Sequence, residues 1–351
     1  GGTTLGLSEI GSIAEANDAR ETGALTPQMQ ALTAVNPNSV AIPVTRVSGV
    51  TTVWTMPQGG MLAGTAATIN LFGYTPDQMD AGGRGIVMNF PSTAGGRRYR
   101  RLSEDERKKR QERALKQLND AWDKAELYAK IENSEEVRNY PEIEALVPVV
   151  KGDMMLFIEA NAAKDITAAI AWVKERGYKQ VVLTGVSEGW RVADEIAASG
   201  LSVITGPVQA IPTRSSDSFD AAYANPGVLQ KAGVKVAIRT MEAENVRNLP
   251  YHAGFAAAYG MGREEALKAI TINAAEILGI GDQVGSIEVG KKANIFVSTG
   301  DPFETASKIT DLFIDGYKIP MTSRQIRLYD EFMNRTPGVD KSKSAIDIKK
   351  K

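Results

Sequence analysis

The feature that most constrains the fold is a regular alternation of short apolar runs with helical patterns from Val50 onward. Apolar runs of four to eight residues rich in β-branched side chains predict strands, and apolar residues three or four apart predict helices. The predicted strands are Val50–Thr55, Ala66–Leu71, Gly85–Phe90, Met155–Ala160, Gln180–Thr184, Leu201–Thr205 and Val234–Thr240. The predicted helices are Lys164–Glu175, Gly189–Ser199, Pro226–Ala232, Pro250–Tyr259 and Arg263–Leu278. This order predicts parallel strands joined by crossover helices, which suits a doubly wound sheet and a closed barrel equally.

Between Arg97 and Val147 the pattern changes to a charged helical segment. Ser103 and Glu106 form a capping box that predicts a helix over Glu104–Ile131. Its one apolar stripe consists of Leu115, Leu118, Trp122, Ala125 and either Leu127 or Tyr128, and a second short helix is predicted from Ser134. We interpret residues 97–147 as a solvated insertion lying over the domain. The alternative is an anion-binding patch made by Arg97, Arg98, Arg100 and Arg101; acidic residues follow closely, so nucleic-acid binding is not predicted.

The third part of the chain, after Gly281, has short strand patterns at Gly285–Ile287, Ala293–Ser298 and Ile309–Ile314. A closing helix is predicted over Arg324–Met333. The segment Val339–Lys351 is rich in Lys and lacks a core pattern, which is typical of disorder.

Composition excludes several kinds of chemistry. The chain has no Cys and one His, His252, so disulfides, thiolate nucleophiles and multi-His zinc sites are excluded, and a Ser-His-Asp triad would depend on that one residue. The net charge of −1 gives no overall attraction to nucleic acid or anionic membranes, and the absence of a long apolar run predicts no membrane span. Because the sequence starts at Gly1 without a leader, it is typical of a processed product or an excised segment, and we favour the periplasm or secretion over the cytoplasm.

Several motifs in the last third carry a family resemblance. Asn245–Gly254 leads into Glu265–Gly279, and Gly285–Val297 is followed by Gly300-Asp-Pro302. This succession resembles the C-terminal third of amidohydrolase-superfamily enzymes related to imidazolonepropionase and to the amidohydrolase-type dipeptidases. Leu5–Gly11 resembles the segment that follows their first barrel strand.

The resemblance implies an α/β fold, a (β/α)₈ TIM-like barrel with a helical insertion and a small partial β-sandwich. The barrel would cover residues 1–280, the C-terminal share of the sandwich residues 281–322, and a helix with a polar tail residues 323–351. In that architecture the sandwich also takes strands from before the barrel, so we expect that an N-terminal segment is missing. Without it, the strands between Gly285 and Ile319 would expose an unpaired edge.

The resemblance also implies metal ligands at the C-terminal mouth of the barrel: a His-x-His, a middle-strand Lys, Glu or His, two later His and a strand-eight Asp. Gly2 and Thr4 stand at the His-x-His positions, and Met241 stands near the Asp position. Glu159 stands at the middle-strand position. One His cannot rebuild this set in any register, and we interpret His252 as a helix residue bonded to a neighbour's backbone. We therefore expect no metal or other cofactor.

Charged and polar residues still follow the predicted strand ends, where barrel active sites are built. These candidates are Glu159, Glu188, Arg239, Glu242 and Asn245. Arg239 follows a buried strand, and if it points inward it needs a carboxylate, for which Glu159 is the candidate. We interpret the pair as a salt bridge filling the vacated metal site; the alternative is a catalytic pair. Further candidate ligand contacts are Arg214 and His252.

Two functions follow from these candidates. In the first, the chain is a metal-free barrel that binds a small amide or peptide, or supports an intact amidohydrolase chain in a homo- or hetero-oligomer. In the second, it hydrolyses C–N bonds of amides or dipeptides, with Glu159 or Glu242 as general base and Arg239 stabilising an oxyanion. Fold alone does not decide between them.

Overall fold

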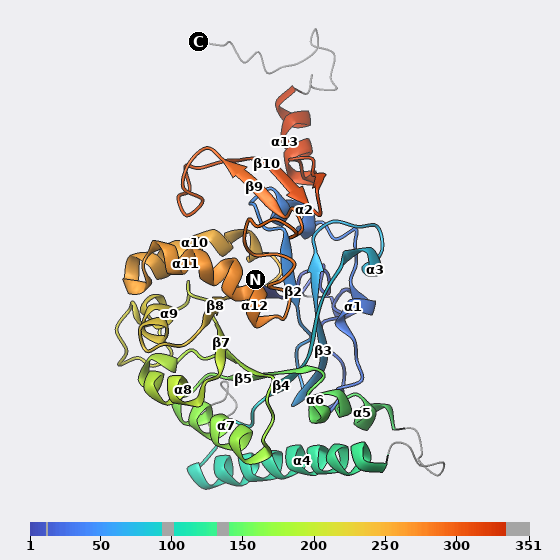
Figure 1. Ribbon diagram of the computed structural model, residues 1–351, viewed down its shortest axis with the longest axis vertical. Coiled ribbons are helices and arrows are strands. Elements are labelled where there is room, and N and C mark those ends of the chain that lie inside the picture. Colours follow the sequence, from blue (N-terminus) through green and yellow to red (C-terminus); the bar gives the residue numbers. More distant parts are fainter. Residues whose placement is uncertain (12, 93–101, 132–139, 335–351) are drawn as a thin grey trace, which may run out of the picture.

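The computed structural model describes residues 1–11, 13–92, 102–131 and 140–334. Its main body is an eight-stranded sheet whose strands are neighbours in chain order (Figure 1). After the last strand, Met241 N donates to Gly2 O over 3.0 Å and Thr4 N donates to Met241 O over 3.2 Å, so the two edges meet and the sheet is a near-closed barrel. The strands are β1 Gly2–Thr3, β2 Thr52–Thr55, β3 Leu62–Asn70, β4 Asp80–Asn89, β5 Met155–Ala160, β6 Val181–Gly185, β7 Ser202–Thr205 and β8 Val236–Ile238.

The barrel is mostly parallel, but the expectation of parallel strands throughout was wrong. β3 pairs antiparallel with both β2 and β4, while the other neighbouring pairs are parallel. The reason lies in the connection from β2 to β3, where residues 56–61 turn through Gly59 and Gly60 at positive φ and no helix intervenes. A short turn reverses the chain, whereas a parallel neighbour needs a crossover.

Helices cover the outside of the barrel along β5 to β8 (Figure 1). They are η3 Gly189–Arg191, α7 Ala163–Arg176, α8 Ala193–Ser199, α9 Ala221–Lys231, η4 Val246–Asn248, α10 Leu249–Ala256, the π-helical η5 Ala257–Met261, α11 Arg263–Ile270 and α12 Ile272–Ile277. Two predicted bounds were wrong: α9 begins five residues before Pro226, and the segment predicted as one helix from Arg263 is broken at Thr271, whose φ of −125° and ψ of −103° are not helical. Short elements near the N-terminus are η1 Ala14–Ala16, α1 Ala31–Ala34, α2 Ala41–Arg46 and α3 Pro76–Met79.

The barrel interior is filled by one inward side chain from most strands. Trp54, Ala66, Val87, Phe157, Val182, Ile204 and Ala237 form one apolar cluster with Ala275, Ile277 and Leu278, which come from α12 and the residue after it. α12 therefore closes the end at which the parallel strands begin. Because side chains alternate along a strand, Glu159 shares the inward face with Phe157, and Arg239 shares it with Ala237. These two side chains lie toward the carboxyl-terminal mouth.

The long predicted helix is present as α4, Glu104–Ile131, with Tyr128 rather than the 59% exposed Leu127 on its buried stripe. The predicted apolar stripe faces the domain, while most residues on the other faces of α4 are exposed or half-buried. Trp122 is fully buried and packs against Trp172 of α7 and Tyr178, with ring centroids 6.0 and 5.1 Å apart. α4 thus shares the main core. It is followed by α5 Pro141–Glu144 and α6 Val147–Lys151; the helix start at Ser134 and the Arg97–Arg101 patch lie outside the described residues.

A separate antiparallel sheet consists of β9 Ile295–Ser298, β10 Ile309–Ile314 and β11 Tyr317–Lys318, in the order β11-β10-β9. The strand predicted over Gly285–Ile287 was wrong, because this segment forms a bend. Gly285 has a φ of +101°, and a Cβ there would lie 2.8 Å from Ala275 Cβ, so the segment is fitted closely against α12. The closing helix is present as α13, Arg324–Asn334, while Val339–Lys351 lies outside the described residues.

Candidate functional site

The candidate site lies at the barrel mouth and is centred on a buried ion pair. Arg239 Nη2 lies 2.7 Å from Glu159 Oε1, so the ion pair expected from the sequence is confirmed. The Arg239 side chain is 1% exposed and that of Glu159 is 15% exposed. Arg239 Nε also donates to Gly206 O over 3.3 Å, and Nη1 lies 3.9 Å from Met56 Sδ. The guanidinium therefore lies inside the barrel, among the inward side chains nearest the carboxyl-terminal mouth.

Glu159 is held by three donors. Besides Arg239, Asn161 Nδ2 donates to its Oε1 over 2.9 Å and Thr184 Oγ1 donates to its Oε2 over 2.8 Å. Burial raises the pKa of Glu159, but the charge and hydrogen bond of Arg239 and the two further donors outweigh it, so the pKa lies below its usual range. Glu159 is an ionised, fully engaged carboxylate at neutral pH.

Asn161 is a site residue that the sequence analysis missed. Its amide links Glu159 to the next loop, because Ser187 Oγ donates to Asn161 Oδ1 over 2.7 Å and Glu188 N donates to Asn161 O over 2.9 Å. Its position two residues beyond Glu159, directly after β5, was the available signal. Asn161 is itself exposed at the mouth.

A second ion pair fastens the loop over the mouth. Arg214 Nε and Nη2 donate to Glu188 Oε1 and Oε2 over 2.5 and 2.6 Å, and Ala163 N donates to Oε2 over 3.0 Å. The Glu188 side chain is 2% exposed, whereas that of Arg214 is 52% exposed. Burial raises the pKa of Glu188, but these donors outweigh it and the net pKa is lowered. A further ion pair joins Arg191 to Asp217, and the Arg191 Cζ atom lies 4.0 Å from the centroid of the Trp190 ring.

The other candidates lie apart from the Glu159–Arg239 pair. Asn245 Nδ2 donates to Glu242 Oε2 over 2.6 Å in the connection between β8 and α10, where Glu242 is exposed. His252 is 3% exposed on α10, and its Nδ1 accepts from Val208 N over 3.1 Å. Burial lowers the pKa of His252 to about 4, so the imidazole is neutral. This is the backbone bond expected for His252 from the sequence; its part in ligand binding stays a prediction.

The positions at which the resemblance implies metal ligands, Gly2, Thr4 and Met241, do not fit a divalent cation. A Cβ on Gly2 would lie 2.9 Å from Trp54 Cε3 and 3.3 Å from Arg239 Cβ and Cδ, so the space beside Gly2 is taken by these two side chains. Thr4 is buried, and Met241 has a φ of +71°. Within the described ranges, no group of three or more His, Asp or Glu side chains is placed to hold a metal ion. A guanidinium in contact with Glu159 adds positive charge where a cation would need anionic donors.

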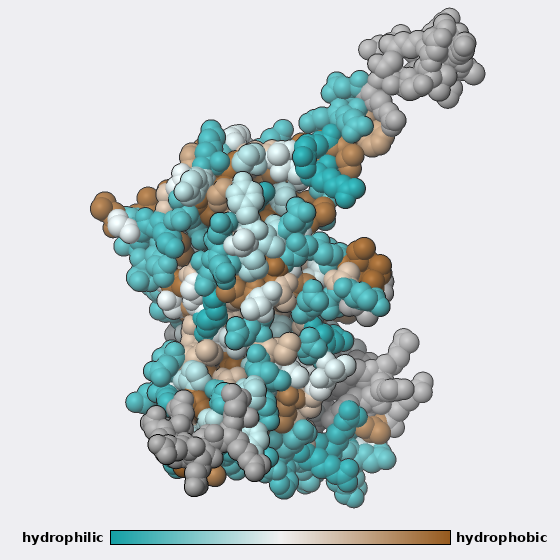
Figure 2. All heavy atoms as spheres, turned by 90° about the vertical axis from the view of Figure 1, so that its right-hand side faces the viewer, coloured by the Kyte–Doolittle hydropathy of each residue, from teal (hydrophilic) through white to brown (hydrophobic). Residues whose placement is uncertain are grey.

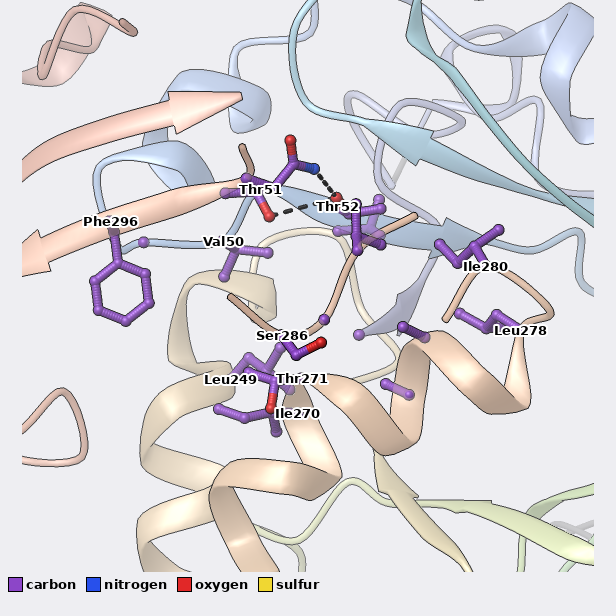
Figure 3. A pocket seen from close by; sticks show the side chains of 18 of the residues that line it. Val50, Thr51, Thr52, Leu249, Ile270, Thr271, Leu278, Ile280, Ser286 and Phe296 are labelled. Carbon is purple, nitrogen blue, oxygen red and sulfur yellow. Dashed lines mark hydrogen bonds between the residues drawn. The ribbon is translucent and has the colours of Figure 1, made fainter. Parts of the chain in front are cut away.

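Two cavities are candidate ligand sites. The larger, about 290 Å³, lies where β1 and β2 begin, between α11, α12 and β9, and is lined mainly by apolar side chains (Figure 3). Among its polar side chains, Asn294 Nδ2 donates to Thr52 Oγ1 over 3.0 Å, whereas the buried Thr68 Oγ1 has no hydrogen-bond partner among the described residues. The smaller, about 60 Å³, lies at the mouth and is lined by Ser187, Trp190, Thr205 and Asp217 among others. Because barrel chemistry is built at the carboxyl ends of strands, the mouth is the candidate site.

An eight-stranded near-closed barrel with charged residues at its carboxyl-terminal mouth defines the class of TIM-barrel proteins. The amidohydrolase from Thermotoga maritima has a similar solved structure, with a TM-score of 0.78 and 26% identity over 92% of this chain and 85% of that one. Residues 214–319 match the model of the amidohydrolase family.

Two curated relatives match by sequence. Amidohydrolase tasK from Hapsidospora irregularis is 29% identical over 170 residues, which is 38% of this chain and 17% of the relative. Imidazolonepropionase from Thermoplasma volcanium is 36% identical over 93 residues, which is 24% of this chain and 22% of the relative. The matches to the curated relatives thus span less than a quarter of their length. Together with the fold, these matches support the assignment of the chain to the amidohydrolase superfamily.

Proposed function

We propose that this chain is a metal-free member of the superfamily that binds a small amide or peptide at the barrel mouth. The observation that supports this is the position of Arg239: its buried guanidinium pairs with Glu159 and fills the space beside Gly2. The buried Arg239 cation and the hydrogen-bonded Glu159 carboxylate form the polar base of this site. Asn161 and Ser187 lie above it and present groups that suit the N–H and C=O of an amide.

Hydrolysis by Glu159 is the competing proposal, and the observation in its favour is that this carboxylate is 15% exposed at the mouth. The lowered pKa of Glu159 makes it a weak proton acceptor, and three donors already occupy its oxygens. Ligand binding therefore agrees better with the geometry than general-base catalysis does.

The proposal that the chain supports an intact amidohydrolase subunit draws on two exposed apolar side chains near the mouth. Ile211 and Phe219 are 88% and 68% exposed in the segment between β7 and α9. Apolar side chains on loops beside a site are suited to contact with another protein. Co-purification with an intact amidohydrolase chain, and its loss in Ile211→Ser, would test this.

The central experiment measures metal, turnover and binding on one preparation. The protein is purified with zinc or manganese supplied, its metal content is determined, and a panel of amides and dipeptides is assayed with and without chelator. We expect substoichiometric metal, no turnover and calorimetrically detectable binding that Asn161→Ala weakens and the surface control Glu276→Gln leaves unchanged.

Each alternative has a distinct result. Stoichiometric metal with chelator-sensitive turnover contradicts the proposal. Metal-free turnover that Glu159→Gln abolishes supports the hydrolase instead.

A further inference from the structure

The larger cavity lies at the end of the barrel opposite the mouth. It has a volume of about 290 Å³ and is enclosed by β2 and the residues before it, by α11 and α12, by the segment after α12 and by β9 (Figure 3). Its walls are mainly apolar, and the side chains around it include Val50, Ile270, Ile280 and Phe296. This volume is close to the lower end of the range for small-molecule sites, which begins at about 300 Å³.

The wall of this cavity differs from the outer surface. The face shown in Figure 2 is largely hydrophilic, and no helix built from described residues is long and apolar enough to cross a bilayer. In contrast, none of the described residues that line the cavity has a charged side chain, although charged residues make up 24% of the chain. The Gly1 amino group also lines it, and burial lowers the pKa of this group to about 5, so it is neutral at pH 7. An ion would lose its hydration here without gaining a counter-ion, so the cavity suits an uncharged molecule.

Two polar groups on the wall have no hydrogen-bond partner among the described residues. They are Trp54 Nε1 and Thr68 Oγ1, whose residues are 1% and 0% exposed. Trp54 on β2 is directly opposite Thr68 on β3. Opposite residues in an antiparallel pair have Cβ atoms about 4.5–5.5 Å apart, so both groups belong to the same part of the wall. A buried donor without an acceptor destabilises the fold, and an acceptor from outside the chain would remove that cost.

The chemistry of these two groups specifies the ligand. An indole N–H only donates, and a threonine hydroxyl can donate as well. A carbonyl oxygen has two lone pairs and can accept from both groups, whereas a hydrocarbon can accept from neither. Other hydroxyls on the wall are already engaged, since Thr271 Oγ1 donates to Leu267 O over 2.7 Å and Ser286 Oγ donates to Glu288 Oε1 over 2.5 Å.

The cavity is open to solvent at one side. Ile287 is among its lining residues and is 84% exposed, and the neighbouring Ser286 is half-buried. A small molecule can therefore enter beside residues 285–287 while the barrel stays closed.

We infer that this cavity binds a small uncharged molecule with an apolar body and one carbonyl oxygen. Trp54 Nε1 and Thr68 Oγ1 donate to that oxygen, and the apolar body lies against side chains such as Val50, Ile270 and Leu278. Binding at this end of the barrel is independent of any ligand at the mouth.

The test compares three probes that share a phenyl ring and differ in the group attached to it. Acetophenone carries a carbonyl, cumene has a methyl group in place of the carbonyl oxygen, and benzoate carries a carboxylate. Titrations of the full chain followed by NMR should give saturable binding of acetophenone. Cumene should bind about threefold to tenfold more weakly, because it leaves both donors unpaired. Benzoate should bind at least about a hundredfold more weakly, because its charge would be buried without a partner.

Thr68→Val keeps the branched shape of the side chain and removes the hydroxyl. It should weaken acetophenone about threefold to tenfold and leave cumene unchanged. Ser286→Ala is the matched control on the same wall and should change neither affinity, since the Ser286 hydroxyl already donates to Glu288. The indole N–H resonance of Trp54, assigned with Trp54→Phe, should move downfield with acetophenone and stay in place with cumene.

The comparison of acetophenone with cumene uses the parent chain, so it stands even if a variant folds poorly. Three results overturn the inference. The first is no saturable binding of acetophenone. The second is equal acetophenone affinity of the parent and Thr68→Val together with an unmoved Trp54 resonance. The third is benzoate binding as tight as that of acetophenone.

Discussion

Replacing Arg239 by Met should lower the free energy of unfolding by about 3 kcal/mol, because it leaves the Glu159 carboxylate buried without its cation. Removing one partner of a buried pair typically costs about 3–5 kcal/mol. The lower end applies here, since Glu159 is 15% exposed and keeps hydrogen bonds from Asn161 and Thr184. For 351 residues, an unfolding entropy of about 2.1 cal/mol/K per residue converts this loss into a melting temperature about 4 °C lower.

The assay is urea unfolding of the parent and the variant across pH. The pKa of Glu159 is lowered in the folded chain, so its stabilisation is present above the unfolded pKa of about 4.3 and is lost as pH falls through the folded value. In the Arg239→Met variant, Arg239 no longer lowers the pKa of Glu159. The stability gap between parent and variant should therefore shrink below about pH 4.

Two controls make this reasoning refutable. Lys235→Met removes the surface pair with Glu276, whose side chains are 49% and 43% exposed, and should cost less than about 1 kcal/mol. Glu159→Leu combined with Arg239→Met removes both charges and should be more stable than Arg239→Met alone. A gap under about 1 kcal/mol for Arg239→Met, or one that is constant with pH, would falsify the account of a buried, coupled pair.

Three further predictions concern other parts of the molecule. Trp122→Ala should lower the free energy of unfolding, measured with urea, by about 3–5 kcal/mol because its ring fills the core between α4 and α7. A loss under about 1 kcal/mol would contradict the contribution of α4 to the core. Arg214→Ala should lower the global free energy of unfolding by less than about 1 kcal/mol, since its side chain is 52% exposed. It should nevertheless raise amide hydrogen exchange over residues 207–218, and unchanged exchange would contradict the role of the Glu188–Arg214 pair in holding this loop. The single imidazole, His252, should stay neutral in NMR titrations from about pH 8 to 5, because burial lowers its pKa to about 4. Its stabilisation is present above about pH 6.5 and lost as pH falls toward 4, and a midpoint near 6.5 would contradict its burial.

Most of the fold could be predicted because its elements have strong local patterns. All seven strands predicted between Val50 and Thr240 are present, and Glu104–Ile131 has the predicted bounds. The direction of β3 was not predicted, since apolar periodicity gives a strand but not its orientation. The break at Thr271 was also missed, because both halves continue the same helical pattern and the kink depends on how α12 closes the barrel.

The site was predictable only where charge forced a partnership. Arg239 in a buried strand needed an anion, and Glu159 was the carboxylate at a matching strand end, so the pair followed from the cost of an unpaired buried charge. Asn161 carries no charge, and an Asn after a strand is common in turns, so its position directly after β5 was only a weak signal. Its position depends on how the loops after β5 and β6 meet.

Gly2, Trp54 and Arg239 form one unit in which each residue depends on the others. A His at position 2 would place its Cβ 2.9 Å from Trp54 and 3.3 Å from Arg239, so a His side chain does not fit there while both large side chains remain. Removing Arg239 alone would open space but leave Glu159 without its cation. A His at position 2 therefore requires changes on β1, on β2 and at the end of β8 together. This coupling explains how the barrel keeps the side chains nearest its mouth packed, with the Arg239 guanidinium paired to the Glu159 carboxylate.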